Sequence, residues 1–395
     1  MLRPARNRRA DSRRAISRRW AWLLLAGALA IPPIRFAVMA FHHDPPASAS
    51  DREQRLRLLA RARVFVDPSD HRDQPGWAAA DFPDAADVSC IYVPKAPRGT
   101  TLKFDCRTSS GEIVKVKYGR TRERLAEVAA TRLLRAMDFG ADRVSFVQRL
   151  HCYGCPPSPF RARLIAEQFF LTPVLDWLQN NTTVRTYDWV TIERELAGRE
   201  ITAGDVGGWS WPELDEVREG AGGATRGEID ALRLMAVFLA HWDAKPGNQR
   251  LICMESRDAT DSCRLPLLML QDVGATFGPG KVQLAAWQRL PMWTDAAACR
   301  VSMEQLPYQG AGFGSAQISE EGRRLLATRF RQFSSSDIAA LLQSARFAAD
   351  APADREEQVI SAWTAAFMDK VAQIVDRPPC PSVSGHLGRR PLEAS

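Results

Sequence analysis

The sequence lacks an excess of charge of either sign once its first 50 residues are set aside. Those residues hold nine Arg against Asp11 and Asp44, and the rest of the 395-residue chain holds 44 basic and 44 acidic side chains. Binding to nucleic acid depends on clustered positive charge, so this balance excludes a nucleic-acid partner for the main part of the chain. Internal repeats and low-complexity segments are also absent, which excludes a repeat architecture.

A second cysteine motif or a pair of histidines at metal-binding spacing is missing as well. The CxxC of Cys152 and Cys155 is therefore not half of a zinc site, and no thioredoxin-like context surrounds it. The eight cysteines instead favour structural disulfides. Cys90 with Cys106 and Cys253 with Cys263 flank predicted strand pairs and are expected to be bonded. The partners of the remaining four stay open: Cys152, Cys155, Cys299 and Cys380.

The basic excess at the N-terminus is followed by an apolar run, residues 20–41. Basic residues followed by an apolar run are typical of an export signal or a signal anchor. Eight Arg before Trp20 favour a cytoplasmic N-terminus, which places the main domain on the outer side of the membrane. We expect a bacterial-type inner-membrane protein with a single span through 20–41, or a secreted protein if the signal is cleaved.

Hydrophobic periodicity divides the rest of the chain. Residues 42–86, rich in Pro, Asp and Ala, indicate a linker with one helical run. Residues 87–172 predict a β-rich lobe with one helix, in which VSFVQRL and RARLIAEQFF are expected to be strands. Residues 173–375 predict a mostly helical lobe, and 376–395 form a tail. The fold class is therefore α+β.

Two short stretches carry the polar residues that a reaction needs. HWDAKPGN (241–248) follows an apolar helix and supplies Asp243, Lys245 and Asn248, whereas LLMLQDVG (267–274) supplies Asp272 directly after an apolar strand. Phosphoryl transfer requires oxygen ligands for Mg²⁺, a group that orients the acceptor hydroxyl and a cation near the phosphates. These side chains fit those requirements, and His241 is expected to be structural.

These motifs resemble the protein kinase-like superfamily. The His-x-Asp-x-Lys-Pro-x-Asn spacing matches the catalytic loop of protein kinases, and Asp272-Val273-Gly274 takes the place of their Asp-Phe-Gly. The loop is also similar to that of aminoglycoside-type phosphotransferases. With the order of the lobes, the resemblance spans about residues 87–350 and implies a two-lobed kinase-like fold behind the signal anchor.

The resemblance also implies roles. Asp243 would be the catalytic base or hydroxyl-orienting group, Lys245 a charge near the transferring phosphate, and Asn248 and Asp272 the metal ligands. The implied cofactors are ATP and Mg²⁺ (or Mn²⁺). The implied acceptor is a hydroxyl group of a protein, a sugar or a lipid.

A kinase-like β-lobe also needs a strand lysine and a helix glutamate. Lys117 in IVKVKYG and Glu127 in LAEVAATRLL supply them and would bind the nucleotide. Lys115 lies on the same strand face as Lys117 and remains an alternative, as Glu123, one helical turn away, does for Glu127.

Lysine is scarce, and its placement is informative without any family. The chain has 7 Lys against 46 Arg, yet three of the seven fall within IVKVKYG and HWDAKPGN, namely Lys115, Lys117 and Lys245. An ammonium and a guanidinium are not interchangeable at a phosphate, so this use of Lys indicates a site that does not accept Arg.

Two departures from protein kinases shape the functional hypothesis. No GxGxxG precedes Lys117, and the stretch 98–101 (RGTT) is the nearest substitute for a phosphate-covering turn. No Ala-Pro-Glu follows Asp272-Val273-Gly274. The sequence therefore resembles atypical kinases, such as secretory-pathway and phosphoinositide-kinase-like enzymes. We predict an exported or membrane-anchored ATP-dependent phosphotransferase, with a pseudokinase that binds nucleotide or partners without turnover as the alternative.

Overall fold

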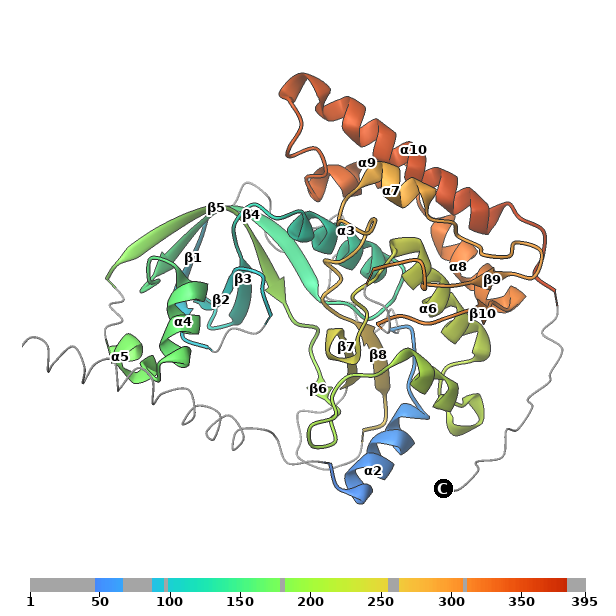
Figure 1. Cartoon of the computed structure of the whole chain (residues 1–395), viewed down its shortest axis with the longest axis horizontal. Helices are drawn as coiled ribbons and strands as arrows, with labels where there is room; N and C mark the ends of the chain where they lie inside the picture. The colour runs from blue at the N-terminus through green and yellow to red at the C-terminus, as the bar shows by residue number, and fades with distance from the viewer. Residues whose placement is uncertain are drawn as a thin grey trace, which may run out of the picture.

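The computed structural model describes residues 47–66, 87–95, 99–177, 182–254, 263–307 and 311–381. The predicted signal anchor, 20–41, lies outside these residues. Within the described part of the chain, no helix is both long and apolar enough to cross a membrane. The chain forms a β-rich lobe and a mostly helical lobe that lie side by side (Figure 1), which agrees with an α+β fold.

A closed barrel forms the first lobe, with strands in the order β1-β2-β3-β5-β4. Its strands are β1 (Asp87–Val93), β2 (Lys103–Thr108), β3 (Ile113–Lys117), β4 (Arg143–Tyr153) and β5 (Val184–Arg194). Alternate residues of β1, namely Val88, Cys90 and Tyr92, are buried in the barrel core, as the period of a strand requires. β1 pairs in parallel with β4, and this pairing closes the barrel.

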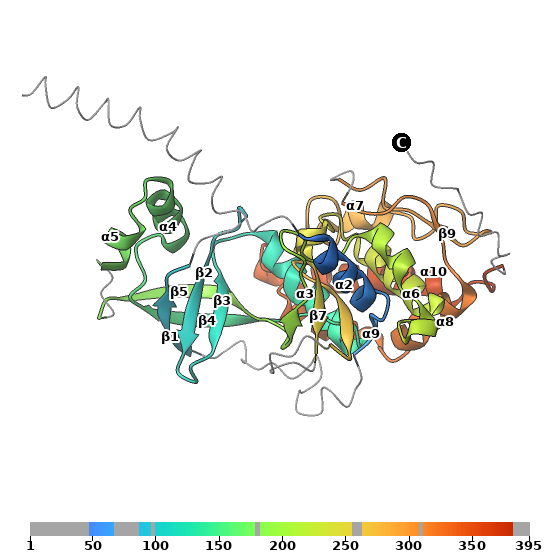
Figure 2. The ribbon, with the colours of Figure 1, turned by 90° about the horizontal axis from the view of Figure 1, so that it is seen from below.

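One long helix connects the two lobes. α3 (Arg122–Ala136) is buried from Arg124 to Leu134 and contacts both β4 and α9 (Ser335–Ser344). In Figure 2 it lies between the barrel and the helices of the second lobe. Side chains on different faces of α3 can therefore reach the barrel and the helical lobe.

Two predictions about this lobe are wrong. RARLIAEQFF is not a strand but belongs to α4 (Pro159–Gln168), which is followed by α5 (Thr172–Trp177). Pro159 at the start of α4 suits the first helical turn, and the apolar residues there do not alternate. β5, which falls in the predicted helical lobe, pairs with β3 and β4, so the barrel extends to Arg194 rather than to residue 172.

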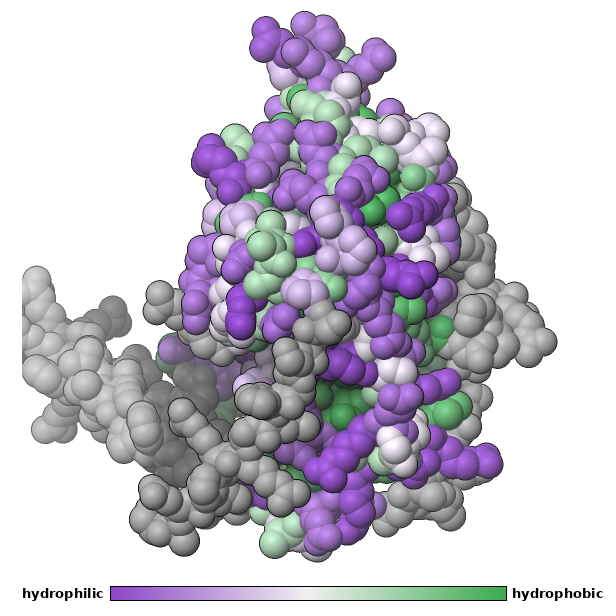
Figure 3. Space-filling view, turned by 90° about the vertical axis from the view of Figure 1, so that its right-hand side faces the viewer, coloured by the Kyte–Doolittle hydropathy of each residue, from purple (hydrophilic) through white to green (hydrophobic). Residues whose placement is uncertain are grey.

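The second lobe is mostly helical. Its elements are α6 (Arg226–Leu239), α7 (Leu284–Arg289), α8 (Glu320–Phe330), α9, α10 (Glu356–Val375), the short helices η2 (Trp211–Glu216), η3 (Glu219–Ala221), η4 (Pro246–Asn248) and η5 (Ala353–Arg355), the sheet β6 (Arg199–Glu200), β7 (Gln249–Cys253) and β8 (Pro266–Leu270), and the pair β9 (Arg300–Val301) and β10 (Ala316–Gln317). Phe238 of α6 packs edge-on against Trp287 with ring centroids 5.7 Å apart, at the centre of this core. The outer face of the lobe is mostly hydrophilic (Figure 3).

The predicted linker is only partly a linker. Residues 49–59 form α2 (Ala49–Leu59), which is capped by Ser48 and followed by a chain that packs into the main core through Ala62 and Val64. Arg55 of α2 is buried, and its Nη1 lies 2.5 Å from Oε1 of Glu213. The helix is therefore attached to the helical lobe, because its one buried arginine finds a carboxylate there.

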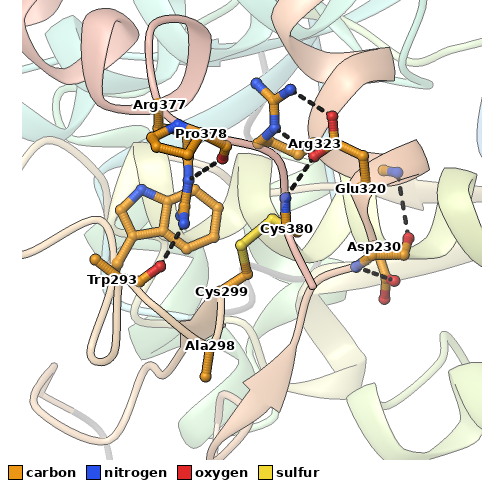
Figure 4. The surroundings of a disulfide bond; sticks show 12 residues. Asp230, Trp293, Ala298, Cys299, Glu320, Arg323, Arg377, Pro378 and Cys380 are labelled. Atoms are coloured by element: carbon orange, nitrogen blue, oxygen red, sulfur yellow. Dashed lines mark hydrogen bonds and ion pairs between the residues drawn. A yellow bond between two sulfur atoms is a disulfide. The ribbon is translucent and has the colours of Figure 1, made fainter. Parts of the chain in front are cut away.

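Four disulfides include all eight cysteines. The expected bonds Cys90–Cys106 and Cys253–Cys263 are confirmed. The structure also pairs Cys152 with Cys155 within the CxxC, and Cys299 with Cys380. Figure 4 shows that the last bond holds the chain end that follows α10, where Glu320 accepts a hydrogen bond from the Cys380 backbone at 2.8 Å. The start of the predicted tail is therefore fixed to the helical lobe.

Candidate active site

A cavity of about 870 Å³ lies where the two lobes meet. The barrel contributes the β1–β2 turn, β2 and β3, and the helical lobe contributes the loop after α6 and the residues after β8. Six of the seven predicted site residues line the cavity: Lys115, Lys117, Asp243, Lys245, Asn248 and Asp272. The seventh, Glu127, contacts Lys117 from α3. The structure thus brings together all seven residues that the sequence singled out.

Lys117 is the strand lysine that meets the helix glutamate. Its Nζ lies 2.5 Å from Oε1 of Glu127, 3.4 Å from Oε2 of Glu193 and 3.4 Å from Oδ1 of Asp272. Lys115 is paired differently, with its Nζ 2.5 Å from Oε1 of Glu193. Lys117 and Lys115, the two alternatives for the strand lysine, therefore differ in their contacts: Lys117 contacts both α3 and the helical lobe, and Lys115 contacts Glu193.

The pKa values in this cluster depend on burial and on the neighbouring charges, which are carboxylates for the lysines and lysines for the carboxylates. Burial disfavours the charged form of Lys117, but the carboxylates of Glu127, Glu193 and Asp272 outweigh it and raise its pKa. Burial raises the pKa of Glu127, and Lys117 counteracts that shift. For Glu193, burial is outweighed by Lys117 and Lys115, and its pKa is lowered. The barrel side of the cavity is thus an interdependent set of buried charges.

Glu193 is a site residue that the sequence analysis missed. It lies on β5, directly opposite Lys115 in the β3–β5 register, so the two side chains share one face of the sheet. The alternating stretch VRTYDWV is a local signal that β5 is a strand. Its pairing with β3, more than 70 residues earlier, has no such signal in the local sequence.

Glu123, the alternative to Glu127, has a different role. Its carboxylate accepts a hydrogen bond from Oγ1 of Thr101 at 2.6 Å and pairs with the ammonium of Lys281. α3 also approaches Gly274 so closely that a Cβ there would lie 2.4 Å from Cγ of Glu123. The helix therefore packs on the segment after Asp272 because that position is glycine, and Glu123 joins the β1–β2 turn to this segment.

The loop after α6 is held in place by hydrogen bonds from side-chain amides to its backbone carbonyls. α6 ends at Leu239, and the residue that caps it, Ala240, has a left-handed φ of 53°. Nδ2 of Asn248 donates to the carbonyl of Asp243 at 2.8 Å, and Nε2 of Gln249 donates to the carbonyl of Ala244 at 2.7 Å. The Asp243 carboxylate is in turn contacted by Nζ of Lys245 at 3.0 Å. The loop thus presents a carboxylate and an ammonium at fixed places.

Gly208 packs against the backbone of this loop. Gly208 has a φ of +66°, and a Cβ at this position would lie 1.9 Å from the carbonyl oxygen of Pro246. Its own carbonyl accepts a hydrogen bond from Nη2 of Arg55 at 2.6 Å. The helix α2 therefore contributes indirectly to the site, because it holds the backbone on which η4 rests.

Asp272 stands at the junction of the two lobes. It follows β8 with a left-handed φ of 50°, and the backbone N–H of Gln271 donates to the carbonyl of Asn248 at 3.1 Å. Burial would raise the pKa of Asp272, but Lys117, Lys103 and Lys115 lower it overall. Asp272 and Asn248 both line the cavity, and an ionised carboxylate with an amide oxygen is a donor set of the hard-oxygen type that suits Mg²⁺ or Mn²⁺.

His241 is fully buried beneath this loop. Burial lowers its pKa to about 4, against the opposing influence of Asp272 and Asp243. The imidazole is therefore neutral near pH 7, as suits a structural residue.

The scarce lysines gather at this cavity. Six of the seven in the chain line it, and the three that the sequence analysis did not place there are Lys95, Lys103 and Lys281. Among the lining residues that the structure describes, Arg163 is the one arginine, although the chain has 46. The preference for ammonium over guanidinium in this cavity is thus stronger than the two motifs alone suggested.

No protein-family model matches the sequence, and no curated protein matches it. Among solved structures, the chain is similar to the crystal structure of a Helicobacter pylori proinflammatory kinase, CtkA, with 9% sequence identity. The match covers 73% of this chain and 97% of that chain, with a TM-score of 0.42.

Proposed function

We propose that the chain is an ATP-dependent phosphotransferase that acts on a hydroxyl acceptor. The observation that carries this proposal is a single cavity. In it the buried Lys117, paired with Glu127, contacts Asp272, and Asp243 and Asn248 line the same cavity. Asp272 and Asn248 supply the oxygen ligands, and Asp243 the hydroxyl-orienting carboxylate, that phosphoryl transfer requires. The cavity volume of about 870 Å³ lies within the range of small-molecule sites.

Each lobe has its own task in this proposal. Asp243 orients the acceptor hydroxyl and receives its proton as the transition state forms, and Lys245, 3.0 Å from it, fixes the carboxylate. Asp272 and Asn248 hold Mg²⁺ (or Mn²⁺), which supplies charge neutralisation at the phosphates when bound. The Lys117–Glu127 pair sets the position of α3 and the barrel relative to Asp272.

We also propose that the main domain lies outside the cytoplasm, on a bacterial-type inner membrane through residues 20–41 or secreted. The four disulfides support this, because cytosolic thiols are kept reduced. A fusion of alkaline phosphatase after residue 85 should be active, because that enzyme requires an oxidising compartment. An inactive fusion together with a bright green fluorescent fusion at the same point would place the domain in the cytosol.

The same disulfides favour a competing function. ATP is scarce outside the cytoplasm, so a pseudokinase that uses the cavity for binding alone fits this location. Turnover separates the two functions, because a scaffold needs no hydroxyl-orienting carboxylate.

Nucleotide binding is the first test. The full-length chain, with its disulfides oxidised, should unfold at a higher temperature in Mg·ATP, because a ligand that binds the native state alone stabilises it by about 2.7 kcal/mol at 100 times its Kd. Asp272→Asn should lose the part of the shift that depends on Mg²⁺. No shift of the wild type at millimolar ATP would contradict both the phosphotransferase and a nucleotide-binding pseudokinase.

A further inference from the structure

One cavity lysine differs from the others in its surroundings. Lys103 begins β2 and lies directly opposite Lys117 in the β2–β3 register, so both side chains project from the same face of the sheet. Asp105 and Lys115 form the next such pair on this face. Lys103 lines the cavity together with its neighbours.

The other five cavity lysines already have carboxylate partners. Besides Lys117 and Lys115, Lys95 lies 2.9 Å from Asp105, Lys245 lies 3.0 Å from Asp243, and Lys281 pairs with Glu123. Among the residues that the structure describes, no carboxylate lies within 4.0 Å of the Lys103 ammonium. Lys103 is therefore a cation in the cavity whose charge is not already balanced by a contacting acid.

The Lys103 ammonium lies beside the β1–β2 turn. A Cβ on Gly99, whose φ is +73°, would be 3.7 Å from Nζ of Lys103. Gly99, Thr100 and Thr101 all line the cavity, and Thr101 is tied to Glu123 of α3 at 2.6 Å. A glycine turn held above an ammonium is an arrangement that suits a phosphate, because the backbone can approach the anion closely.

Electrostatics agrees with this geometry. Burial lowers the pKa of Lys103, and Lys117 and Lys115 lower it further, while Asp272 and Glu193 oppose them. A cation that is partly buried beside other cations is stabilised when an anion binds to it. The shift has the direction expected for an ammonium that lacks a counter-ion in the unliganded protein.

We propose that Lys103 and the Gly99–Thr101 turn form a phosphate subsite for the bound nucleotide, and that Lys103 is the lysine that contacts its phosphates. This inference rests on the proposed function. Lys117 is then a positioning residue, because its ammonium is occupied by Glu127 at 2.5 Å and also touches Glu193 and Asp272. The phosphate-binding lysine, which the kinase resemblance places on β3, would then lie on β2.

Nucleotide affinity tests this assignment. In the full-length oxidised protein, Lys103→Met should weaken binding of Mg·ATP roughly tenfold to hundredfold, as expected for loss of a hydrogen bond to a charged group. Binding of adenosine should stay within about twofold of wild type, because adenosine has no phosphate. Inorganic tripolyphosphate should lose affinity in parallel with ATP if the subsite recognises phosphate alone. Lys103→Arg should recover part of the ATP affinity, because it restores the charge but not the compact shape.

Lys95→Met is the matched control. It removes the same charge from the same cavity, but Lys95 is largely exposed and is already paired with Asp105. We expect less than about a threefold change in Mg·ATP affinity. Unfolding without nucleotide checks that the Lys103 variants fold, and Lys103→Gln gives the same comparison should Lys103→Met not fold.

Two results would overturn the subsite. One is wild-type affinity of Lys103→Met for Mg·ATP, and the other is an equal loss of affinity for adenosine, which would indicate a general distortion of the cavity. A wild-type protein that binds no Mg·ATP would instead refute the proposed function on which the subsite rests. The two failures are thus distinguished by the wild type alone.

Discussion

The two sides of the cavity differ in how their charged groups meet solvent. On the barrel side, the side chains of Lys117, Glu127 and Glu193 are 3%, 2% and 4% exposed, and Lys117 contacts both carboxylates. On the helical side, Asp243 and Lys245 are 24% and 44% exposed. Buried pairs hold a geometry because separation of their charges is costly, whereas exposed groups are accessible to a substrate. In the proposed function, the buried pairs of the barrel side would therefore hold the geometry of the cavity, and the exposed groups of the helical side would meet the acceptor.

Loss of Lys117 should have the largest effect on stability. Lys117→Met leaves Glu127 and Glu193 buried without their common ammonium, and removal of one partner from a buried ion pair typically costs about 3–5 kcal/mol. Urea unfolding of the oxidised protein would measure the loss. A decrease below about 1 kcal/mol would show that the buried cluster does not fix the barrel side.

The contributions of Asp142 in the barrel lobe and His241 in the helical lobe to the free energy of unfolding should depend on pH in opposite directions. Burial, and then Glu193, raises the pKa of Asp142 in the barrel lobe to about 7, whereas burial lowers the pKa of His241 to about 4. The Asp142 contribution to stability is complete below its unfolded pKa near 3.8 and is lost as pH rises towards 7. The His241 contribution is complete above its unfolded pKa near 6.5 and is lost as pH falls towards 4.

Two variants isolate these contributions between about pH 4.5 and 6.5. As pH rises through this window, wild type should lose about 2 kcal/mol relative to Asp142→Asn and gain about 2 kcal/mol relative to His241→Phe. Urea unfolding at several pH values gives both differences. Slopes of the same sign would contradict the contrast between the lobes.

The smallest stability effect is expected on the helical side. Lys245→Met removes an ion pair whose lysine is 44% exposed, and solvent screening limits such pairs to about 0–1 kcal/mol. It makes the same substitution as Lys117→Met, so the two variants compare the sides directly. An equal loss of stability in both would mean that exposure does not separate the two ion pairs.

Local motifs account for the part of the site that was predictable. Asp243, Asn248 and Asp272 lie on two short segments, and Glu127, which the kinase resemblance indicated with Glu123 as its alternative, lies ten residues after Lys117. Backbone hydrogen bonds within and between these segments then settle their placement. Spacing along the chain is enough for such residues because few bonds separate them.

Residues placed by long-range pairing were not predictable in this way. Glu193 meets Lys115 across a strand pair 78 residues apart. The docking of α2 depends on Arg55 meeting Glu213 and Gly208, which are 158 and 153 residues away. In each case the partner is chosen by the closed barrel or by the packed core, and not by the local sequence.

Turnover of ATP by the full-length oxidised protein tests the central claim most directly, when it is measured beside Mg·ATP binding for wild type, Asp243→Asn and Asp272→Asn. Asp243→Asn should bind Mg·ATP nearly as wild type does and lower single-turnover phosphate transfer or ATP hydrolysis by about 10²–10⁴-fold, because its carboxylate acts only as the transition state forms. Asp272→Asn should lose Mg²⁺-dependent binding as well as turnover. If wild type and Asp243→Asn bind ATP and turn it over equally slowly, the chain is a pseudokinase and the phosphotransferase is contradicted.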